Sequence, residues 1–443
     1  MNNRFKTFRS RVARLAPSMS AILIALCLTT YTAHCFAQRA DGDEERKTKT
    51  TAAMSERVYK KLSNAQKTIE DKKYDEGLAM LNDLIKERGL SPYEKAQVYN
   101  FFAYTYFTLE RYKDAINAYQ QVLAQPDLPE GLVINSTYTL AQLYFIQEDY
   151  QKAVDLMNKW FSLTKSPTEN AYMILAQAYY QLNEYKQSLE PLKKAYALVK
   201  QRGEKPKENL LLLLRVNYYN LKDTKNMLNV LKELVALYPK SEYWLTMGNA
   251  YSEMKQMNKQ MSIYEMLYEH GDLTSGNQQL NLANLYLMYD VPYKAAKVLD
   301  KGIKTGVIEK NDRNLRLLST AWYQADESAK AIPPMKEAAQ LSDDGEMYVR
   351  LAQAYINLDR YKEAVDALHA GFKKGKIKRA DQAYIMLGMA EFELKEYNPA
   401  LDAFSEAAKD SRSAKSAHQW TKYVESEKNR NKQLEESLKR RRS

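Results

Sequence analysis

The sequence is poor in the residues on which catalytic and metal sites depend. Its two cysteines, Cys27 and Cys35, both lie within the first 37 residues, so a mature chain without them has no disulfide, thiolate nucleophile or thiol ligand. Its four histidines are far apart, and none has the His–Glu spacing of a zinc site. No glycine-rich phosphate loop or nucleophile elbow occurs. We therefore expect no enzyme, no cofactor, no metal and no small-molecule substrate.

The sequence also lacks the alternating apolar and polar residues of strands, although 45% of its residues are hydrophobic and could form a sizeable core. A phrase of roughly three dozen residues recurs instead, and such a period is typical of repeat proteins. Each copy has a residue, usually small, that recurs at intervals of 33 to 39 residues, which predicts ten units. These residues are Ala65, Ala103, Ala141, Ala176, Arg215, Gly248, Ala283, Ser319, Ala352 and Gly388.

Within a unit, an aromatic residue follows the small residue by three positions, as Tyr106 follows Ala103. Positions i and i+3 share a helix face, so the small residue lets a second helix approach while the ring fills the space beside it. A turn with its own aromatic residue follows, for example Tyr112, and the second helix then presents Ala115 to the first. Units of two helices that cannot bury their apolar faces alone predict an all-α solenoid.

This pattern resembles the tetratricopeptide repeat (TPR) family over residues 55–408. The resemblance implies a right-handed superhelical solenoid of about ten helix–turn–helix units. Three units depart from the pattern, because Arg215 occupies a small position, Gln260 stands where alanine is usual, and Pro333 and Pro334 interrupt a second helix. We expect irregular packing or a kink at these places.

The N-terminus has the layout of a secretory signal peptide. Five basic residues and no acid precede an apolar run over residues 21–28. Small residues, Cys35 and Ala37, stand at the third and first positions before Gln38, which a signal peptidase reads. We predict a signal peptide over residues 1–37, cleaved after Ala37. A retained membrane anchor is the alternative, because residues 16–37 carry no charge and are long enough to span a bilayer. The polar residues 38–54 are predicted to form a flexible linker.

The net charge of +11 is concentrated at the two ends of the chain. Residues 38–408 contain 50 basic and 50 acidic residues, which argues against a nucleic-acid partner. Residues 409–443 are predicted to form a capping helix and a basic tail, in which Trp420, Tyr423 and Val424 cover the last repeat. The tail ends in four basic residues, 439–442. They form either a solvated end or a contact with anionic lipid headgroups or an acidic partner.

In TPR proteins the first helices line a concave groove, and the repeat register projects the following residues onto it. They are Asn100, Tyr104, Phe107, Asn135, Tyr138, Gln142, Phe145, Asn170, Gln177, Tyr180, Asn209, Tyr219, Asn249, Asn277, Asn284, Tyr323, Gln353 and Asn357. The register adds Met173, Leu212, Leu245, Leu287, Gln382 and Phe392, with charges chiefly at Glu242, Glu253, Arg313, Arg316, Glu346 and Glu393.

Amides and rings therefore dominate the predicted groove. A side-chain amide offers both a donor and an acceptor, so it can pair with the backbone of an extended peptide, and rings can receive apolar or proline side chains. The alternative is that these amides are ordinary polar fillers of a helix face. TPR domains that hold a chaperone's C-terminal carboxylates use basic groove residues, and the scarcity of lysine and arginine here argues against that role.

Several phrases go beyond the general repeat and resemble a group of proteobacterial TPR proteins described as components of the TonB system. They are residues 51–59 (TAAMSERVY), 90–94 (LSPYE), 128–132 (LPEGL), 138–144 (YTLAQLY), 206–209 (PKEN), 238–240 (YPK), 243–245 (YWL), 291–296 (VPYKAA) and 419–420 (QW). The resemblance implies a periplasmic protein that works beside a proton-driven inner-membrane motor, which energises uptake of iron complexes and similar nutrients through the outer membrane.

We therefore expect a periplasmic scaffold that binds a protein or extended peptide, in particular a component of TonB-dependent energy transduction. The alternative is an envelope assembly factor for outer-membrane proteins or cell wall, anchored in the inner membrane if the leader is not cleaved.

Overall fold

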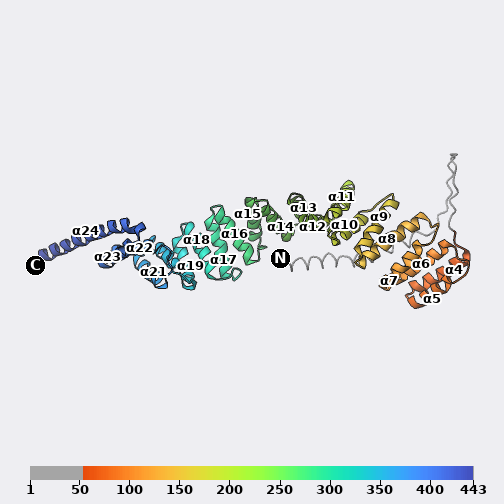
Figure 1. Ribbon diagram of the computed structural model, residues 1–443, viewed down its shortest axis with the longest axis horizontal. Coiled ribbons are helices and arrows are strands. Elements are labelled where there is room, and N and C mark those ends of the chain that lie inside the picture. Colours follow the sequence, from red (N-terminus) through yellow and green to blue (C-terminus); the bar gives the residue numbers. More distant parts are fainter. Residues whose placement is uncertain (1–52, 443) are drawn as a thin grey trace. The chain divides into compact units, whose positions relative to one another are not determined.

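The computed structural model describes residues 53–442, with side chains through Leu438 (Figure 1). Every element of secondary structure in this part of the chain is an α-helix. The prediction of an all-helical repeat solenoid is confirmed. The predicted signal peptide (residues 1–37), its cleavage after Ala37 and most of the linker (residues 38–54) lie outside the described residues.

The helices follow one another as first and second helices of successive hairpins. They are α4 (Glu56–Glu70) and α5 (Tyr74–Ile85); α6 (Pro92–Thr108) and α7 (Tyr112–Leu123); α8 (Glu130–Ile146) and α9 (Tyr150–Leu163); α10 (Glu169–Gln181) and α11 (Tyr185–Gln201); α12 (Glu208–Asn220) and α13 (Thr224–Leu237); α14 (Ser241–Glu253) and α15 (Met257–Glu269); α16 (Gly276–Met288) and α17 (Pro292–Lys304); α18 (Asp312–Gln324) and α19 (Ser328–Leu341); α20 (Glu346–Ile356) and α21 (Tyr361–Lys374); α22 (Ala380–Glu393) and α23 (Tyr397–Ala408). A longer helix, α24 (Ser411–Arg442), follows them.

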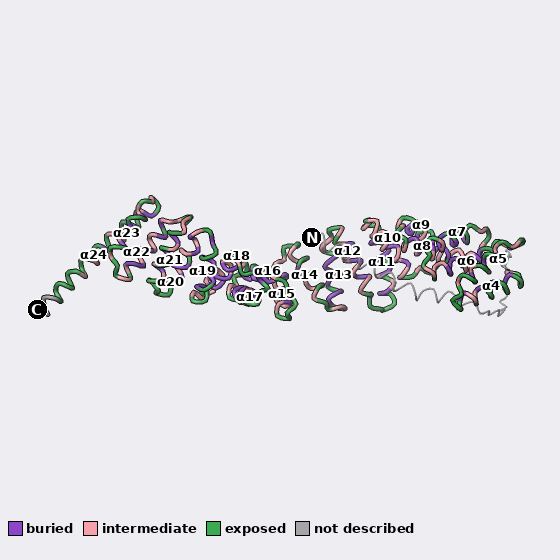
Figure 2. Tube along the Cα trace, turned by 90° about the horizontal axis from the view of Figure 1, so that it is seen from below, coloured by how far each residue is buried: buried purple, intermediate pink, exposed green. Residues whose placement is uncertain are grey.

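The chain forms two compact units that meet in the sequence between Val230 and Leu231, within α13. The N-terminal unit contains α4 to α12, and the C-terminal unit contains α14 to α24. Within each unit, every second helix described here contacts its own first helix and the first helix of the next hairpin. Buried positions consequently recur on every hairpin (Figure 2).

The turn between the two helices of a hairpin has the same backbone conformation in all ten units. A residue with positive φ, between 56° and 64°, lies seven positions after each predicted small residue. The backbone N–H of the next residue donates to a carbonyl five positions back, which together with the left-handed residue forms a Schellman motif that ends the first helix. The left-handed residues are Lys72, Glu110, Glu148, Asn183, Lys222, Lys255, Asp290, Asp326, Asp359 and Lys395.

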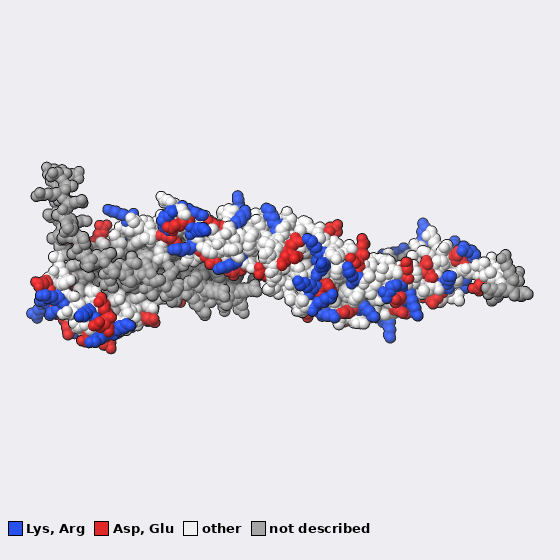
Figure 3. All heavy atoms as spheres, turned by 180° about the vertical axis from the view of Figure 1, so that it is seen from behind, with Lys and Arg blue, Asp and Glu red and all other residues white. Residues whose placement is uncertain are grey.

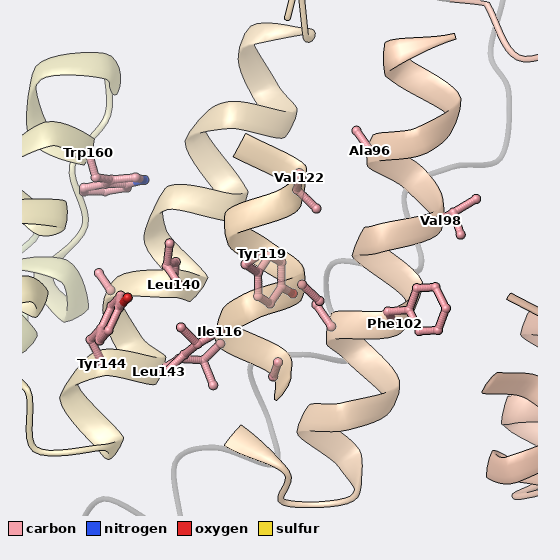
Figure 4. Close-up of a cluster of buried hydrophobic side chains, with 14 of the residues drawn as sticks. Ala96, Val98, Phe102, Ile116, Tyr119, Val122, Leu140, Leu143, Tyr144 and Trp160 are labelled. Atoms are coloured by element: carbon pink, nitrogen blue, oxygen red, sulfur yellow. The ribbon is translucent and has the colours of Figure 1, made fainter. Parts of the chain in front are cut away.

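The core forms where the small residue of a first helix meets a large apolar residue of the second. Ala103, Ala141 and Ala352 are fully buried. Figure 4 shows the same arrangement from α6 to α9, with Val122 and Leu143 directed into the space between helices. Both side chains are fully buried, and each such burial contributes roughly 1.5–3 kcal/mol. Because every hairpin shares this core with the next, the hairpins stabilise one another.

The aromatic residue three positions after each small residue occupies what we call the ring position. In eight hairpins, α6/α7 to α20/α21, this position holds a tyrosine or tryptophan. A polar side chain on the preceding second helix can bond its hydroxyl, since Gln120 Nε2 donates to Tyr144 Oη at 2.8 Å and Asn158 Nδ2 donates to Tyr179 Oη at 3.3 Å. A cation often covers the ring face, for example Lys152 Nζ at 5.0 Å from the Tyr144 centroid.

Buried carboxylates tie the start of one first helix to the start of the next. Glu94 of α6 accepts hydrogen bonds from the backbone N–H and the hydroxyl of Ser55, at 2.9 and 2.6 Å, while completing a capping box with Ser91. Asp381 of α22 accepts a hydrogen bond from Ser413 of α24 at 2.7 Å. These ties join hairpin ends that lie more than 30 residues apart in the sequence.

The expected irregularity at Pro333 and Pro334 is not seen as a break, because α19 runs without interruption from Ser328 to Leu341. Both prolines fall in the first two turns, so only two backbone hydrogen bonds near the helix start are lost. Gln260, in the usual alanine position of α15, is buried and hydrogen-bonds the Tyr264 hydroxyl. Arg215 lies within the regular helix α12.

Helix α24 packs against α22 and α23. Val424 is fully buried, and Trp420 stacks on Phe404 with ring centroids 5.7 Å apart. Tyr423 is half exposed and meets Phe392 at 5.4 Å. These contacts cover the apolar face that α23 would otherwise expose to water.

We predict that Gly388→Ala destabilises the C-terminal unit by about 1–3 kcal/mol, because the added Cβ would lie 2.7 Å from the Phe404 ring. Urea unfolding followed by tryptophan fluorescence measures the change. In a Phe404→Leu background, which recreates the pairing of Ala352 with a leucine in the preceding hairpin, the same substitution costs much less. Equal costs in both backgrounds would contradict the packing account.

A second prediction concerns Glu94. Burial raises the pKa of this carboxyl, but hydrogen bonds from Ser55 and Ser91 outweigh burial and lower the pKa from 4.5 to about 2. The folded state therefore gains stability that is complete above pH 4.5 and is lost as pH falls toward 2. We expect Glu94→Gln to cost on the order of 2–3 kcal/mol at pH 6 and several-fold less at pH 2.

The measurement is urea unfolding followed by circular dichroism at both pH values. Glu56→Gln is the matched control, because the Glu56 carboxylate is 81% exposed and pairs with Lys60 on the same helix. If the cost of Glu94→Gln is the same at pH 6 and pH 2, the tie is not ionic.

Candidate functional site

Several first helices contact the first helix of the next hairpin directly. In the N-terminal unit α4 contacts α6, α8 contacts α10 and α10 contacts α12, and in the C-terminal unit α20 contacts α22. No pair of successive second helices makes a comparable contact among the described residues. In a curved stack the more closely spaced layer is the inner one. We call the exposed side of this layer the first-helix surface, and it carries the predicted groove residues.

Three neighbouring first helices lack charge almost entirely. After their first turns, α6 (residues 96–108), α8 (residues 131–146) and α10 (residues 170–181) contain no acidic, basic or histidine residue. Basic and acidic side chains are interspersed over the face of the molecule seen in Figure 3. This part of the first-helix surface, on α6, α8 and α10, is the candidate site.

All eighteen predicted site residues remain accessible to solvent, because none of them is buried. Six are exposed and the others are half-buried. The exposed ones are Asn135, Tyr219, Asn249, Asn277, Asn284 and Asn357. The half-buried ones are Asn100, Tyr104, Phe107, Tyr138, Gln142, Phe145, Asn170, Gln177, Asn209, Tyr180, Tyr323 and Gln353. Met173, which the register also assigned to this surface, is only 5% exposed and belongs to the core.

The rings at the C-terminal ends of α6, α8 and α10 are held by the turn that follows each helix. Phe107 meets Tyr112 at 5.9 Å with an interplanar angle of 63°, and Phe145 meets Tyr150 at 5.4 Å and 69°. Tyr180 meets the following turn tyrosine, Tyr185, at 5.6 Å and 59°. Inclined ring pairs of this kind are attractive beyond their buried area. The candidate site therefore has three rings whose orientation is fixed before any ligand binds.

Tyr138 joins two neighbouring first helices. Its ring lies 5.0 Å from that of Trp160, and its hydroxyl hydrogen-bonds the side chain of Asn170 on α10. Burial raises the pKa of Tyr138 to about 12, while the hydrogen bond with Asn170 acts in the opposite direction. The hydroxyl stays protonated at any physiological pH, so this pair is a fixed polar contact between α8 and α10.

Several predicted amides of the C-terminal unit already have partners within the protein. Asn357 Nδ2 donates to Tyr323 Oη at 3.0 Å, and Gln353 Nε2 donates to Asn357 Oδ1 at 2.9 Å. Asn249 Oδ1 accepts a hydrogen bond from the Tyr264 hydroxyl at 2.7 Å. Asn357 and Asn249 thus connect neighbouring helices, while Gln353 bonds within its own helix end, as the polar-filler interpretation predicts.

Other amides make no side-chain hydrogen bond within the part of the chain that the structure describes. Four of them lie on the candidate site, namely Asn100 on α6, Asn135 and Gln142 on α8, and Gln177 on α10. Each offers a donor and an acceptor to a ligand. Because no charge accompanies them, a ligand that pairs with them needs no counter-charge. The chemistry of the site thus suits an uncharged backbone with alternating N–H and C=O groups.

Sequence reasoning missed how the rings are supported. It assigned Tyr112, Tyr150 and Tyr185 to turns without connecting them to the groove. The signal was present, because in each of these hairpins the turn tyrosine follows the surface ring by five residues. Trp160 was not predicted at all, since its contact with Tyr138 joins separate helices.

The described residues include no group of three or more His, Cys, Asp or Glu side chains placed to hold a metal ion. No described helix combines the length and apolar character needed to cross a bilayer.

Family models match four segments of the chain. Models described as "Tetratricopeptide repeat" match residues 96–124, 216–241 and 349–415. A model described as "Anaphase-promoting complex, cyclosome, subunit 3" matches residues 133–195. The chain therefore contains tetratricopeptide repeats, as its sequence pattern predicted. Proteins built from these repeats are generally scaffolds for protein–protein interaction.

Solved structures show likeness at low identity. MamA is 20% identical, with 40% of this chain and 94% of that chain covered and a TM-score of 0.33. YrrB, described as a TPR protein with an unusual peptide-binding site, is 15% identical, with 43% and 97% covered and a TM-score of 0.35. The Cut9–Hcn1 assembly of the anaphase-promoting complex is 12% identical, with 83% of each chain covered and a TM-score of 0.28. No curated protein matches the chain significantly.

We predict that Tyr138→Phe destabilises the N-terminal unit by about 0.5–1.5 kcal/mol, because the side chain of Asn170 loses its partner. Urea unfolding followed by the fluorescence of Trp160, whose ring is 5.0 Å away, measures the loss. Tyr104→Phe is the control, since the structure gives the Tyr104 hydroxyl no hydrogen bond to a described residue. Equal effects of the two substitutions would mean that the Tyr138–Asn170 contact contributes nothing.

Proposed function

We propose that the protein is a periplasmic scaffold that holds an extended segment of a protein partner on the candidate site of α6, α8 and α10. The observation that carries the proposal is the combination of unpaired amides, fixed rings and absent charge on three adjacent helices. A partner segment in extended conformation exposes a backbone donor and acceptor every two residues, which unpaired amides can bind. Apolar or proline side chains of the same segment suit the rings.

The charge distribution supports a neutral segment over the acidic C-terminus that other TPR domains bind. The carboxylate of a ligand bound on α6, α8 or α10 would find no lysine or arginine on these helices beyond their first turns. Burying such a charge without a partner is costly, so the site discriminates against acidic ligands. We infer that the preferred segment is uncharged and contains proline or other apolar residues.

We further propose that the partner belongs to the TonB system and that the scaffold assists energy transduction for nutrient uptake, including iron. This part rests on the sequence phrases that resemble the TonB-associated group, such as residues 51–59 and 291–296. The leader over residues 1–37 supports export, because it has the basic start, apolar run and small-residue cleavage site of a signal peptide.

The basic end of α24 supports a contact with the membrane surface. Residues 439–442 are all basic, and each can add about 1 kcal/mol of attraction near an anionic leaflet. Co-sedimentation with anionic vesicles tests this part, with substitution of the four residues by glutamine as the comparison. Undiminished binding by that variant would remove the tail from the proposal.

The partner site is tested by the double substitution Gln142→Ala with Gln177→Ala. We expect affinity for the native partner to fall about tenfold or more, because two hydrogen bonds to its backbone are lost. The measurement is affinity capture from periplasmic extract followed by titration of the captured partner. Gln121→Ala with Gln187→Ala is the matched control, since both residues are exposed on second helices. Weakening by the control pair, or none by the site pair, would refute the location.

Growth separates the two cellular roles. If the scaffold serves TonB-dependent uptake, a deletion strain grows poorly when iron is limiting, and the site double variant fails to restore growth. If it assembles the envelope instead, the deletion grows normally when iron is limiting but leaks envelope contents. N-terminal sequencing of the mature protein separates cleavage after Ala37 from a retained anchor.

A further inference from the structure

The last hairpin, α22/α23, has no aromatic residue at its ring position. Glu391 lies three positions after the small residue Gly388, so it occupies the ring position that holds tyrosine or tryptophan in the eight preceding hairpins. The backbone confirms the register, because the Glu391 carbonyl accepts the Schellman hydrogen bond from Glu396 N–H at 2.9 Å, as the ring residues do elsewhere. A carboxyl group therefore stands where the fold expects an aromatic ring.

The partner of this position has changed as well. In other hairpins the ninth residue of the preceding second helix can hydrogen-bond the ring hydroxyl, as Gln120 does for Tyr144 and Asn158 for Tyr179. Here that ninth residue is His369 on α21, and its Nε2 lies 3.9 Å from Glu391 Oε1. The tyrosine and amide pair of those two hairpins is replaced here by a glutamate and a histidine.

The carboxyl group is buried without adequate compensation. Glu391 is 4% exposed, and its Oε2 has no hydrogen-bond partner among the described residues. A buried polar atom without a partner is uncommon in folded proteins and costs stability, most of all when it is charged. The 3.9 Å separation from His369 is too long for a hydrogen bond.

The surrounding charges favour the neutral carboxyl. Helices α20, α21, α23 and α24 all pack against α22. Glu396 at the start of α23 and Asp402 within α23 repel a negative charge at Glu391, and His369 on α21 is the nearest basic group. Within the described residues, α20 and α24 contribute no charge that acts on it. Burial first, and then the two acids, raise the pKa of Glu391 from 4.5 to about 7.

We propose that the Glu391 carboxyl, which faces His369, is a proton-responsive contact between the hairpins α20/α21 and α22/α23. When the carboxyl is protonated, α22 docks on α21 without a buried charge at this position. When it ionises, an uncompensated charge lies between the two helices and the interface loosens. Because α24 packs on α22 and α23, loosening releases the last hairpin and α24 together.

The sign of the effect follows from the two states of the carboxyl. Below pH 4.5 it is protonated whether α22 is docked or not, so docking is strongest. Between pH 4.5 and about 7 the undocked form ionises while the docked form holds its proton, so docking weakens as pH rises. Above about pH 7 the carboxyl is ionised in both forms, so docking stays at its weakest. The equilibrium constant for local opening is expected to rise on the order of 10- to 100-fold between pH 5 and pH 8.

Hydrogen exchange of the full chain tests the proposal. Protection factors of the α22 amides, corrected for the intrinsic pH dependence of exchange, give the opening constant at pH 5 and pH 8. We expect the wild-type constant to rise within the stated range. Glu391→Gln should remove the dependence and keep the protection seen at pH 5. Glu393→Gln, which removes the same charge from an exposed position two residues away, should leave the dependence unchanged.

Two further variants keep the proposal falsifiable if Glu391→Gln folds poorly. Glu391→Tyr restores the ring of the other hairpins and should also be independent of pH. His369→Asn recreates the pairing position of Asn158 and should keep a rise with pH, since the carboxyl remains. The proposal is overturned if wild-type protection is equal at both pH values, or if the dependence survives both substitutions of Glu391. Loss of the dependence in His369→Asn alone would assign the switch to the histidine and overturn it as well.

Discussion

The contact between a small residue on one helix and a large side chain on the next is the constraint on which the rest of the structure depends. Where Ala103 or Ala141 stands, two helices approach closely, and the ring three residues later seals the space beside them. The left-handed turn then fixes the direction of the second helix, so each hairpin presents the same surface to the next. Stability therefore spreads along the stack, and no hairpin depends on a remote core.

Because the rings are needed for packing between helices, many of the aromatic residues say nothing about function. The ring position serves packing, and its hydroxyls are often bonded by the preceding helix, as Gln120 bonds Tyr144. Residues that face outward from the first helices do not occupy the ring position. On α6, α8 and α10 they are uncharged, and some amides, such as Gln142 and Gln177, remain unpaired. The function we propose uses only these outward-facing residues.

The hairpin register and the all-helical fold could be predicted because each depends on spacing within a unit. The small residue, the ring and the left-handed turn all lie within eight residues of one another, so the sequence displays them directly. The contacts that support the first-helix surface could not be predicted from spacing in the same way. Tyr138 meets Trp160 and Asn170 only after helices pack, and the burial of Met173 and the continuity of α19 through Pro333 and Pro334 depend on neighbours distant in sequence. The burial of Glu391 could not be predicted either, because it depends on how the helices pack.

The central claim is that a partner segment lies across α6, α8 and α10. Site-specific photo-crosslinking in the native compartment tests it most directly, with the crosslinking side chain at exposed Asn135 on α8 or at exposed Gln121 on α7. The account predicts an adduct from position 135 that maps to an uncharged, extended segment of one partner, with little or none from position 121. An adduct of equal yield from position 121, or none from position 135 while the partner is bound, would contradict it.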